Sequence, residues 1–420
     1  DTANANTICG TTTASRNVIS SNNTGVRLNT VNNTMVQGNY IGVDRTGGND
    51  VGNTNDGVLI EDGSTNNTIG GTTAAARNII SGNDRHGVYI FGNATDSNTV
   101  SGNYIGTDST GMNDVGNTED GVNIDESDNN TIGGSVAGAG NRISGNNEDG
   151  VHIGDGAFIN GDDATGNFVR GNLIGSEVTG MTALPNSRFG VYIEGASGNT
   201  IGGTTALERN VISGNNAEGV QITGSTANGN LIRGNFIGTD ITGAAPLPNQ
   251  LDGVEIVDGS DNEIGGTVDG AGNVIAFNVA EGVEIAGTPA TGNAIRRNSI
   301  FNNGNAGELG IDLSDQAMEG DDVTANDFFP TTDDDEGANR LQNFPEFIGN
   351  AVLLGNSIAF RYRVPTNVLN ATYPLTVEFF VADSANQEGQ SFLASDTYTA
   401  AEAGLSKFVV IPAQRVLTNN

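Results

Sequence analysis

Short apolar strings recur along the chain at regular intervals. The string Gly-Val-x-Ile, or a close variant, begins at ten glycines that lie 28 to 40 residues apart. These are Gly25, Gly57, Gly87, Gly121, Gly150, Gly190, Gly219, Gly253, Gly282 and Gly310. Each interval holds three short apolar strings, as at residues 87–90, 98–100 and 103–105. Because glycine and asparagine separate them, we expect short strands joined by turns.

A repeat of three short strands without helical periodicity predicts a parallel β-solenoid. Each coil stacks on the next at strand spacing, so the ten intervals predict about ten coils. Alternate residues of a strand face opposite ways, so the x of Gly-Val-x-Ile faces outward. We call this row the outward stripe, and it comprises Arg27, Leu59, Tyr89, Asn123, His152, Tyr192, Gln221, Glu255, Glu284 and Asp312. Acidic residues precede many of the glycines, so we expect much of the negative charge on this face. They are Asp56, Asp120, Asp149, Glu218, Asp252 and Glu281.

Two other rows follow from the repeat. Stacked asparagines can bond to corner backbone and to one another. We expect one asparagine ladder on one kind of coil and a second ladder on the alternate kind. The first comprises Asn39, Asn103, Asn172, Asn235 and Asn298, and the second Asn83, Asn146 and Asn215. The last strand of each coil carries an outward apolar residue, such as Tyr40, Ile79 or Tyr104, and we expect the chain's own loops to cover it, with a docked partner as the alternative.

Charge and composition exclude several classes of function. The 420 residues hold 17 basic and 50 acidic side chains, for a net charge of −33, so the surface repels nucleic acid and anionic lipid. No apolar run reaches the length of a membrane span, which argues against membrane insertion. The single cysteine, Cys9, excludes internal disulfides and multi-cysteine metal sites. Because the chain begins at Asp1 without methionine, we expect a removed leader or an excised fragment, and both are compatible with export.

The pattern changes after residue 313. Residues 314–350 form an acidic linker or cap segment, and its carboxylates favour either bound Ca²⁺ or a solvated linker. The candidate calcium ligands are Asp321, Asp322, Asp327, Asp333, Asp334 and Asp335. From residue 351 to 420 longer alternating strings predict a small antiparallel β-sandwich that caps the last coil. The predicted β-helix therefore spans residues 1–313.

The repeats resemble a known family. Residues 67–83, which begin Asn-Thr-Ile-Gly-Gly-Thr-Thr, and residues 102–111, Gly-Asn-Tyr-Ile-Gly-Thr-Asp-Ser-Thr-Gly, are similar to repeats of secreted bacterial right-handed parallel β-helix proteins. That fold is shared with pectate lyases, and the resemblance covers residues 1–313. It implies an all-β chain, with a right-handed parallel β-helix of about ten coils before the sandwich, that is secreted or on the cell surface. The fold hosts lyases, epimerases, adhesins and structural rods, so the resemblance does not choose among them.

Three functional hypotheses follow. The first is a structural or adhesive rod, in which Tyr89, Asn123, Gln221, Glu255 and Glu284 bind a glycan or cell-surface polymer. The second is a polysaccharide lyase or C5-epimerase, in which Tyr192, His152 and Arg188 act as base, acid and neutraliser of the sugar carboxylate. The third is a filament subunit that self-associates through an open solenoid end or the apolar stripe. The acidic face opposes the second hypothesis, since it repels an acidic glycan without Ca²⁺, and no segment matches the Asp-Pro-His-Asp pattern associated with alginate epimerases.

Overall fold

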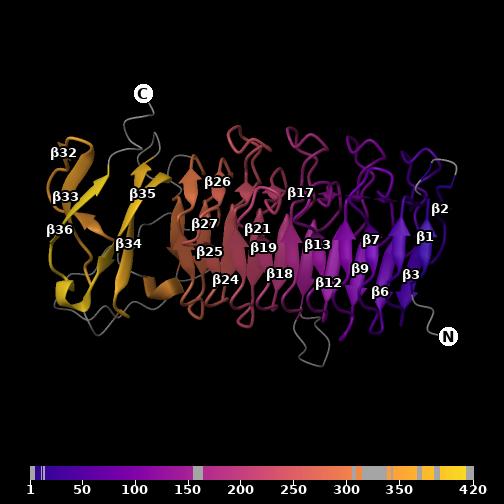
Figure 1. Ribbon diagram of the computed structural model, residues 1–420, viewed down its shortest axis with the longest axis horizontal. Helices are drawn as coiled ribbons and strands as arrows, with labels where there is room; N and C mark the ends of the chain where they lie inside the picture. Colours follow the sequence, from indigo (N-terminus) through magenta and orange to yellow (C-terminus); the bar gives the residue numbers. More distant parts are fainter. Residues whose placement is uncertain are drawn as a thin grey trace.

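Three long parallel sheets build most of the molecule, which forms an elongated rod (Figure 1). The computed structural model describes residues 5–10, 12, 15–154, 164–304, 309–314, 338–341, 344–366, 371–382 and 388–412. The six aspartates predicted to bind Ca²⁺, Asp321, Asp322, Asp327, Asp333, Asp334 and Asp335, lie outside the described residues.

Every coil contributes one strand to each sheet, and neighbouring coils pair in parallel. The first sheet contains β1 (Thr7–Cys9), β4 (Met35–Gln37), β7 (Thr68–Gly70), β10 (Thr99–Ser101), β13 (Thr131–Gly133), β16 (Phe168–Arg170), β19 (Thr200–Gly202), β22 (Leu231–Arg233), β25 (Glu263–Gly265) and β28 (Ala294–Arg296). The second contains β2 (Val18–Ile19), β5 (Tyr40–Ile41), β8 (Ile79–Ile80), β11 (Tyr104–Ile105), β14 (Arg142–Ile143), β17 (Leu173–Ile174), β20 (Val211–Ile212), β23 (Phe236–Ile237), β26 (Val274–Ala276) and β29 (Ser299–Phe301). The third contains β3 (Val26–Asn29), β6 (Val58–Glu61), β9 (Val88–Phe91), β12 (Val122–Asp125), β15 (Val151–Gly154), β18 (Val191–Glu194), β21 (Val220–Thr223), β24 (Val254–Val257), β27 (Val283–Ala286) and β30 (Ile311–Ser314). The predicted right-handed parallel β-helix of ten coils is confirmed.

Stacks of aliphatic side chains fill the rod. Ile60, Ile90 and Ile124 occupy the same position on successive coils and are fully buried. Each such side chain contributes roughly 1.5–3 kcal/mol through burial. Glycine lets the coil turn between strands, as at Gly70, where φ is +93° and a Cβ atom would lie 2.0 Å from the carbonyl oxygen of Ser101. The repeat therefore fixes both the core and its corners.

Continuous asparagine ladders run along the rod and include every coil between their ends, so the prediction of separate ladders on alternate coils is wrong. The Asn78 side-chain amide donates to Asn103 Oδ1 at 3.0 Å, and that of Asn103 donates to Asn141 Oδ1 at 3.1 Å. Asn39, Asn103, Asn172, Asn235 and Asn298 thus share one ladder with the asparagines of the coils between them. Asn83, Asn146 and Asn215 share a second ladder in the same way. The reason is distance, because a hydrogen bond reaches the adjacent coil and not the one beyond it.

The apolar row of the second sheet is covered by the chain's own loops. Tyr40, Ile79 and Tyr104 are buried and form a cluster with Val43, against which Val115 and Val178 also pack. The Arg77 guanidinium lies over the Tyr104 ring, 4.0 Å from its centroid. This covering leaves little of the row as a docking surface for a partner.

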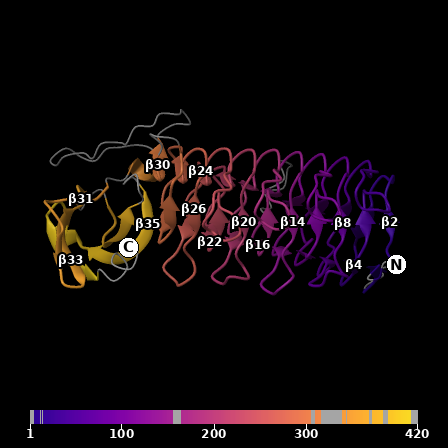
Figure 2. The ribbon, with the colours of Figure 1, turned by 90° about the horizontal axis from the view of Figure 1, so that it is seen from above.

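A small antiparallel region follows the last coil, as predicted (Figure 2). One sheet contains β31 (Glu346–Phe347), β32 (Val352–Leu354), β33 (Ser357–Arg363) and β36 (Lys407–Pro412), and the other contains β34 (Leu375–Ala382) and β35 (Gly389–Tyr398). Phe360 and Tyr362 from the first sheet pack with Val377 and Phe379 from the second. Two 3₁₀ helices, η1 (Ala338–Leu341) and η2 (Ala400–Glu402), are the helices of the described residues, and neither has the length or apolar character to cross a membrane.

This region contacts the end of the rod. The backbone N–H of Arg297 donates to Glu378 Oε2 at 2.8 Å. The Asn303 side chain donates to Glu388 Oε1 at 2.9 Å, so a glutamate accepts the last bond of the second asparagine ladder. The antiparallel region therefore accepts hydrogen bonds from Arg297 and Asn303 of the final coil.

Candidate functional site

The outward stripe forms one continuous row on the third sheet. Tyr89 pairs in register with Asn123, Asn123 with His152, and His152 with Tyr192. The row continues through Gln221, Glu255, Glu284 and Asp312. Arg188 precedes β18 in the turn that leads to Tyr192. The structure therefore brings all the predicted glycan-binding and catalytic residues to one face of the rod.

The acidic residues before the repeat glycines lie deeper than the sequence predicts. Asp56, Asp120, Asp149, Glu218 and Asp252 lie on this face, as expected, but all five are buried beneath its surface. Asp120 Oδ1 accepts a hydrogen bond from the backbone N–H of Asp149 at 2.9 Å. Asp252 Oδ1 accepts one from the backbone N–H of Glu281 at 2.7 Å. Asp120, Asp149 and Asp252 therefore turn inward and accept hydrogen bonds from the backbone of the next coil.

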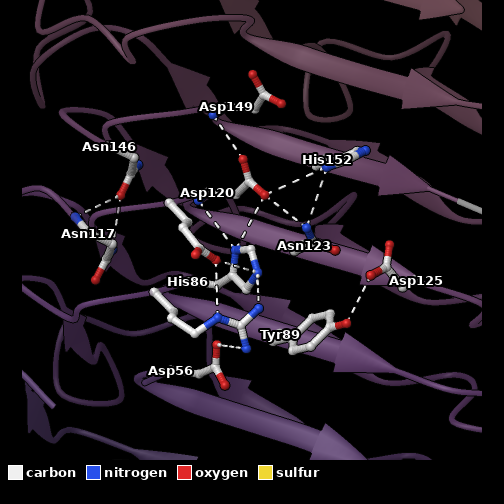
Figure 3. Close-up of polar contacts among 12 residues, drawn as sticks. Asp56, His86, Tyr89, Asn117, Asp120, Asn123, Asp125, Asn146, Asp149 and His152 are labelled. Atoms are coloured by element: carbon white, nitrogen blue, oxygen red, sulfur yellow. Dashed lines mark hydrogen bonds and ion pairs between the residues drawn. The ribbon is translucent and has the colours of Figure 1, made fainter. Parts of the chain in front are cut away.

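Asp120 is the centre of a polar group that includes both histidines of the chain (Figure 3). Asp120 Oδ2 lies 3.3 Å from His86 Nδ1 and 3.7 Å from His152 Nδ1. The same oxygen accepts a hydrogen bond from the Asn123 side chain at 2.8 Å. On the other side of the imidazole, His152 Nε2 lies 3.5 Å from Glu194 Oε2. We call Asp120, His86, His152, Asn123 and Glu194 the histidine cluster.

Mutual contacts determine the charges of this cluster. Burial opposes ionisation of Asp120, but its hydrogen bonds with His152 and His86 lower its pKa below the usual value. Burial also opposes the charged form of His152, yet its ion pairs with the Asp120 and Glu194 carboxylates raise the pKa of His152 to about 10. Burial and the Asp120 charge raise the pKa of the neighbouring Asp149 to about 7. At neutral pH His152 is therefore an imidazolium held between two carboxylates.

Tyr192 and Arg188 adjoin this imidazolium. The Tyr192 ring stacks on His152 with centroids 4.8 Å apart and an interplanar angle of 29°. The Arg188 guanidinium carbon lies 5.7 Å from the Tyr192 ring centroid, and Arg188 NH1 lies 3.7 Å from Asp149 Oδ2. Burial and the Glu194 charge raise the pKa of Tyr192 to about 12. Tyr192 is therefore a neutral phenol beside two cations.

An aromatic group lies on the N-terminal side of the histidine cluster. The Tyr89 hydroxyl donates to Asp125 Oδ2 at 2.9 Å. The Tyr89 ring contacts the rings of His86 and Phe91, with centroids 4.9 Å and 5.4 Å away. Arg85 lies over the same ring, 5.5 Å from its centroid. This part of the face offers apolar rings and a cation to a ligand.

On the C-terminal side, beyond Gln221, the same row is acidic, with Glu255, Glu284 and Asp312. One carboxylate oxygen from each of Glu218, Asp252 and Glu255 lies within 4.8 Å of the others, and we call these three residues the acidic triad. Burial raises the pKa of Asp252 to about 10, and a hydrogen bond with Glu281 and the charges of Glu281 and Glu284 add to the rise. Burial also raises the pKa of Glu255 to about 7, although its hydrogen bond from Gln221 opposes the shift. Within the described residues no lysine, arginine or histidine forms an ion pair with the triad.

The sequence did not assign Asp120, His86 or Glu194 to the catalytic group. Asp120 appeared only as one of the acids that precede the repeat glycines. The signal that could have distinguished it from the other acids is His86, which occupies the same position on the preceding coil. His86 occupies the pre-glycine position that is acidic in Asp56 and Asp120, so a base stands next to acids on adjacent coils. That exchange of an acid for a histidine is visible in the aligned repeats.

No protein-family model matches the sequence, and no curated protein matches it. Among solved structures, the A-module of a mannuronan C-5 epimerase from Azotobacter vinelandii aligns with 72% of this chain and 81% of its own, at 14% identity and a TM-score of 0.42. A periplasmic alginate epimerase aligns with 64% of this chain and 60% of its own, at 15% identity and a TM-score of 0.37. Similarity this low does not assign a function, so the function of the chain has to be argued from its own residues. The three stacked parallel sheets identify the fold, a right-handed parallel β-helix.

Proposed function

We propose that the face around His152 acts on an acidic polysaccharide as a lyase or C5-epimerase. The observation that supports it is the meeting of an imidazolium, a guanidinium and a neutral phenol at His152, Arg188 and Tyr192. The His152 side chain is 18% exposed and that of Arg188 is 48% exposed, so both cations reach solvent. A uronate carboxylate is the ligand that such a pair of cations fits.

Both reactions begin with removal of the proton at C5 of a uronate. The negative charge that develops on the sugar carboxylate is stabilised by fixed positive groups, here His152 and Arg188. Glu194 is ionised, since its hydrogen bond with His152 lowers its pKa, and its side chain is 55% exposed, so it can accept the C5 proton. The Tyr192 hydroxyl then donates a proton. In elimination the C4–O bond breaks, a C4=C5 double bond forms and Tyr192 protonates the leaving oxygen. In epimerisation Glu194 keeps the abstracted proton and Tyr192 delivers a different proton to C5 from the opposite face.

Charge also gives a direction to the bound polymer. An anionic chain is attracted by the positive charges of His152, Arg188 and Arg85, so it extends from His152 toward Asn123 and Tyr89. There it meets the Tyr89 ring and the Arg85 guanidinium. Of the residues predicted to bind glycan, Tyr89 therefore belongs to the proposed site. Asn123 is buried and donates to Asp120, so it positions the cluster and does not reach a ligand. Gln221, Glu255 and Glu284 lie on the opposite side of His152.

The test is a panel of uronate polymers, with ultraviolet detection of unsaturated uronides for elimination and NMR of the C5 configuration for epimerisation. We expect Tyr192→Phe to lower turnover by about 10²–10⁴-fold, the usual contribution of a general acid. His152→Gln removes a fixed positive charge and should lower turnover by about 10²–10³-fold. Tyr104→Phe is the matched control, because Tyr104 lies under loops of the second sheet and its substitution removes the same hydroxyl. Absence of turnover by the unmodified protein on every polymer would remove the proposal.

A glycan-binding rod without catalysis is the second candidate. Tyr192 is only 9% exposed, which favours a structural role for its ring. Such a rod acts in extracellular structure or adhesion and binds polymer through Tyr89. Binding of a panel polymer without product, lost on Tyr89→Ala and kept on Tyr192→Phe, distinguishes this candidate from the enzyme.

A further inference from the structure

We infer that the acidic triad, Glu218, Asp252 and Glu255, is a binding site for a divalent metal cation. Its residues come from two successive coils, with Glu218 before β21, Asp252 before β24 and Glu255 on β24. Their carboxylate oxygens lie within 4.8 Å of one another. Calcium binds oxygen at about 2.3–2.6 Å, so one ion between the three oxygens can touch all of them.

Glu218 supplies an independent observation. The residue is 7% exposed, and its Oε2 atom is fully shielded from solvent and accepts no hydrogen bond within the described part of the chain. A buried carboxylate oxygen without a donor costs free energy that a cation would recover. The other two residues are held in place, since the Gln221 amide donates to Glu255 and the Glu281 backbone donates to Asp252. The triad is thus a positioned set with one unsatisfied oxygen.

Comparison with the histidine cluster shows what is missing. Asp120, Asp149 and His152 also bring their ligand atoms within 4.8 Å of one another. There the protein supplies its own cations, because His152 contacts Asp120 and Arg188 contacts Asp149. The triad has carboxylates at equivalent positions, and Glu281 and Glu284 on the next coil add further charge. An ion from solution would supply the positive charge that no described side chain supplies there.

The ligand set points to a hard cation. All three ligands are carboxylate oxygens, which suit Ca²⁺ or Mg²⁺, whereas zinc prefers nitrogen and sulfur. Calcium tolerates irregular geometry and more ligands than magnesium, so an open set of oxygens on a rigid sheet favours Ca²⁺. This inference concerns a site separate from the proposed catalytic group and does not depend on turnover.

The experiment measures metal binding by calorimetry and thermal unfolding on the chelator-treated full chain, with CaCl₂ and with MgCl₂. We expect Ca²⁺ to raise the melting temperature, since a ligand of the folded state stabilises it. The double variant Glu218→Gln/Glu255→Gln keeps the shape of the triad and removes two charges. The double variant should lose one calcium site per chain, or bind calcium at that site at least tenfold more weakly. In the absence of metal, it should melt at a higher temperature than the unmodified protein.

The matched control is Asp261→Asn/Asp269→Asn, which removes two exposed carboxylates nearby and should keep calcium binding unchanged. Calcium binding and melting temperature test this inference independently of the glycan proposal, because the absence of turnover on the glycan panel would change neither quantity. An unchanged calcium stoichiometry and affinity in the double variant would overturn the inference, and so would a complete lack of calcium uptake by the unmodified protein.

Discussion

The histidine cluster and the acidic triad lie along the same face of the rod and share the same backbone arrangement, but their carboxylates differ in charge. Asp120 in the histidine cluster and Asp252 in the acidic triad both precede a repeat glycine and both bind the backbone of the next coil. The pKa of Asp120 lies below its usual value because of contacts with His152 and His86, whereas burial and neighbouring glutamates raise that of Asp252 to about 10. The repeat thus positions a carboxylate, and its neighbours on adjacent coils decide whether it is charged.

The largest expected effect in this comparison is that of Asp120→Ala. The substitution leaves the His152 imidazolium without its buried partner and leaves the Asp149 backbone N–H without an acceptor. Breaking a buried pair by removing one partner costs about 3–5 kcal/mol, so the free energy of unfolding should fall by that amount. Denaturant unfolding at neutral pH measures it. A loss below about 1 kcal/mol, the range of a surface pair, would show that the cluster is not a buried ionic network.

His152→Gln should have a smaller effect that depends on pH. The raised pKa of His152 means that its stabilising charge is fully present below the unfolded value of about 6.5 and is lost as pH rises through about 10. Charged hydrogen bonds of this kind contribute about 1.5–3 kcal/mol, so the variant should be less stable by that amount near pH 6. The difference should vanish above pH 10. Unfolding curves across this range test the sign, and a constant difference would contradict it.

Asp252→Asn should have the smallest effect and the opposite sign. Because the folded-state pKa of Asp252 is raised, the folded chain holds more protons than the unfolded chain, and stability without metal falls as pH rises from about 4 toward 10. Asparagine keeps the acceptor for the Glu281 N–H and removes the charge. We expect the free energy of unfolding of the metal-free variant to exceed that of the metal-free unmodified protein by about 1 kcal/mol at pH 8, and the difference to grow with pH. Ca²⁺ should stabilise the unmodified protein and reverse this order. Lower stability of the metal-free variant would break the comparison with Asp120.

Much of the fold was accessible from the repeat alone. The spacing of Gly-Val-x-Ile predicted about ten coils, and alternation within each string predicted which residues face the core. Register followed directly, so the adjacency of His152 and Tyr192 was predictable from two aligned strings. The cover over Tyr40 and Tyr104 was predictable too, because an apolar row on a polar rod must be shielded.

The candidate site was harder to predict from the sequence. Aligned repeats show which residues lie on adjacent coils, but they do not show how far a side chain turns toward its neighbour. Asp120 could as well have pointed to solvent, and only the folded chain shows it between His86 and His152. The prediction of asparagine ladders on alternate coils was wrong for a related reason. The sequence repeats every two coils, whereas the asparagine side chains bond from each coil to the next.

The sequence by itself determined the coil, the core and the order of residues along each face, because these depend on periodicity and on the burial of apolar surface. The tertiary structure decided which acids are buried, which are paired with a base and which lie together without one. Those properties depend on distances of a few ångströms between side chains about 30 residues apart, and on the low dielectric around them, which makes one neighbouring charge decisive.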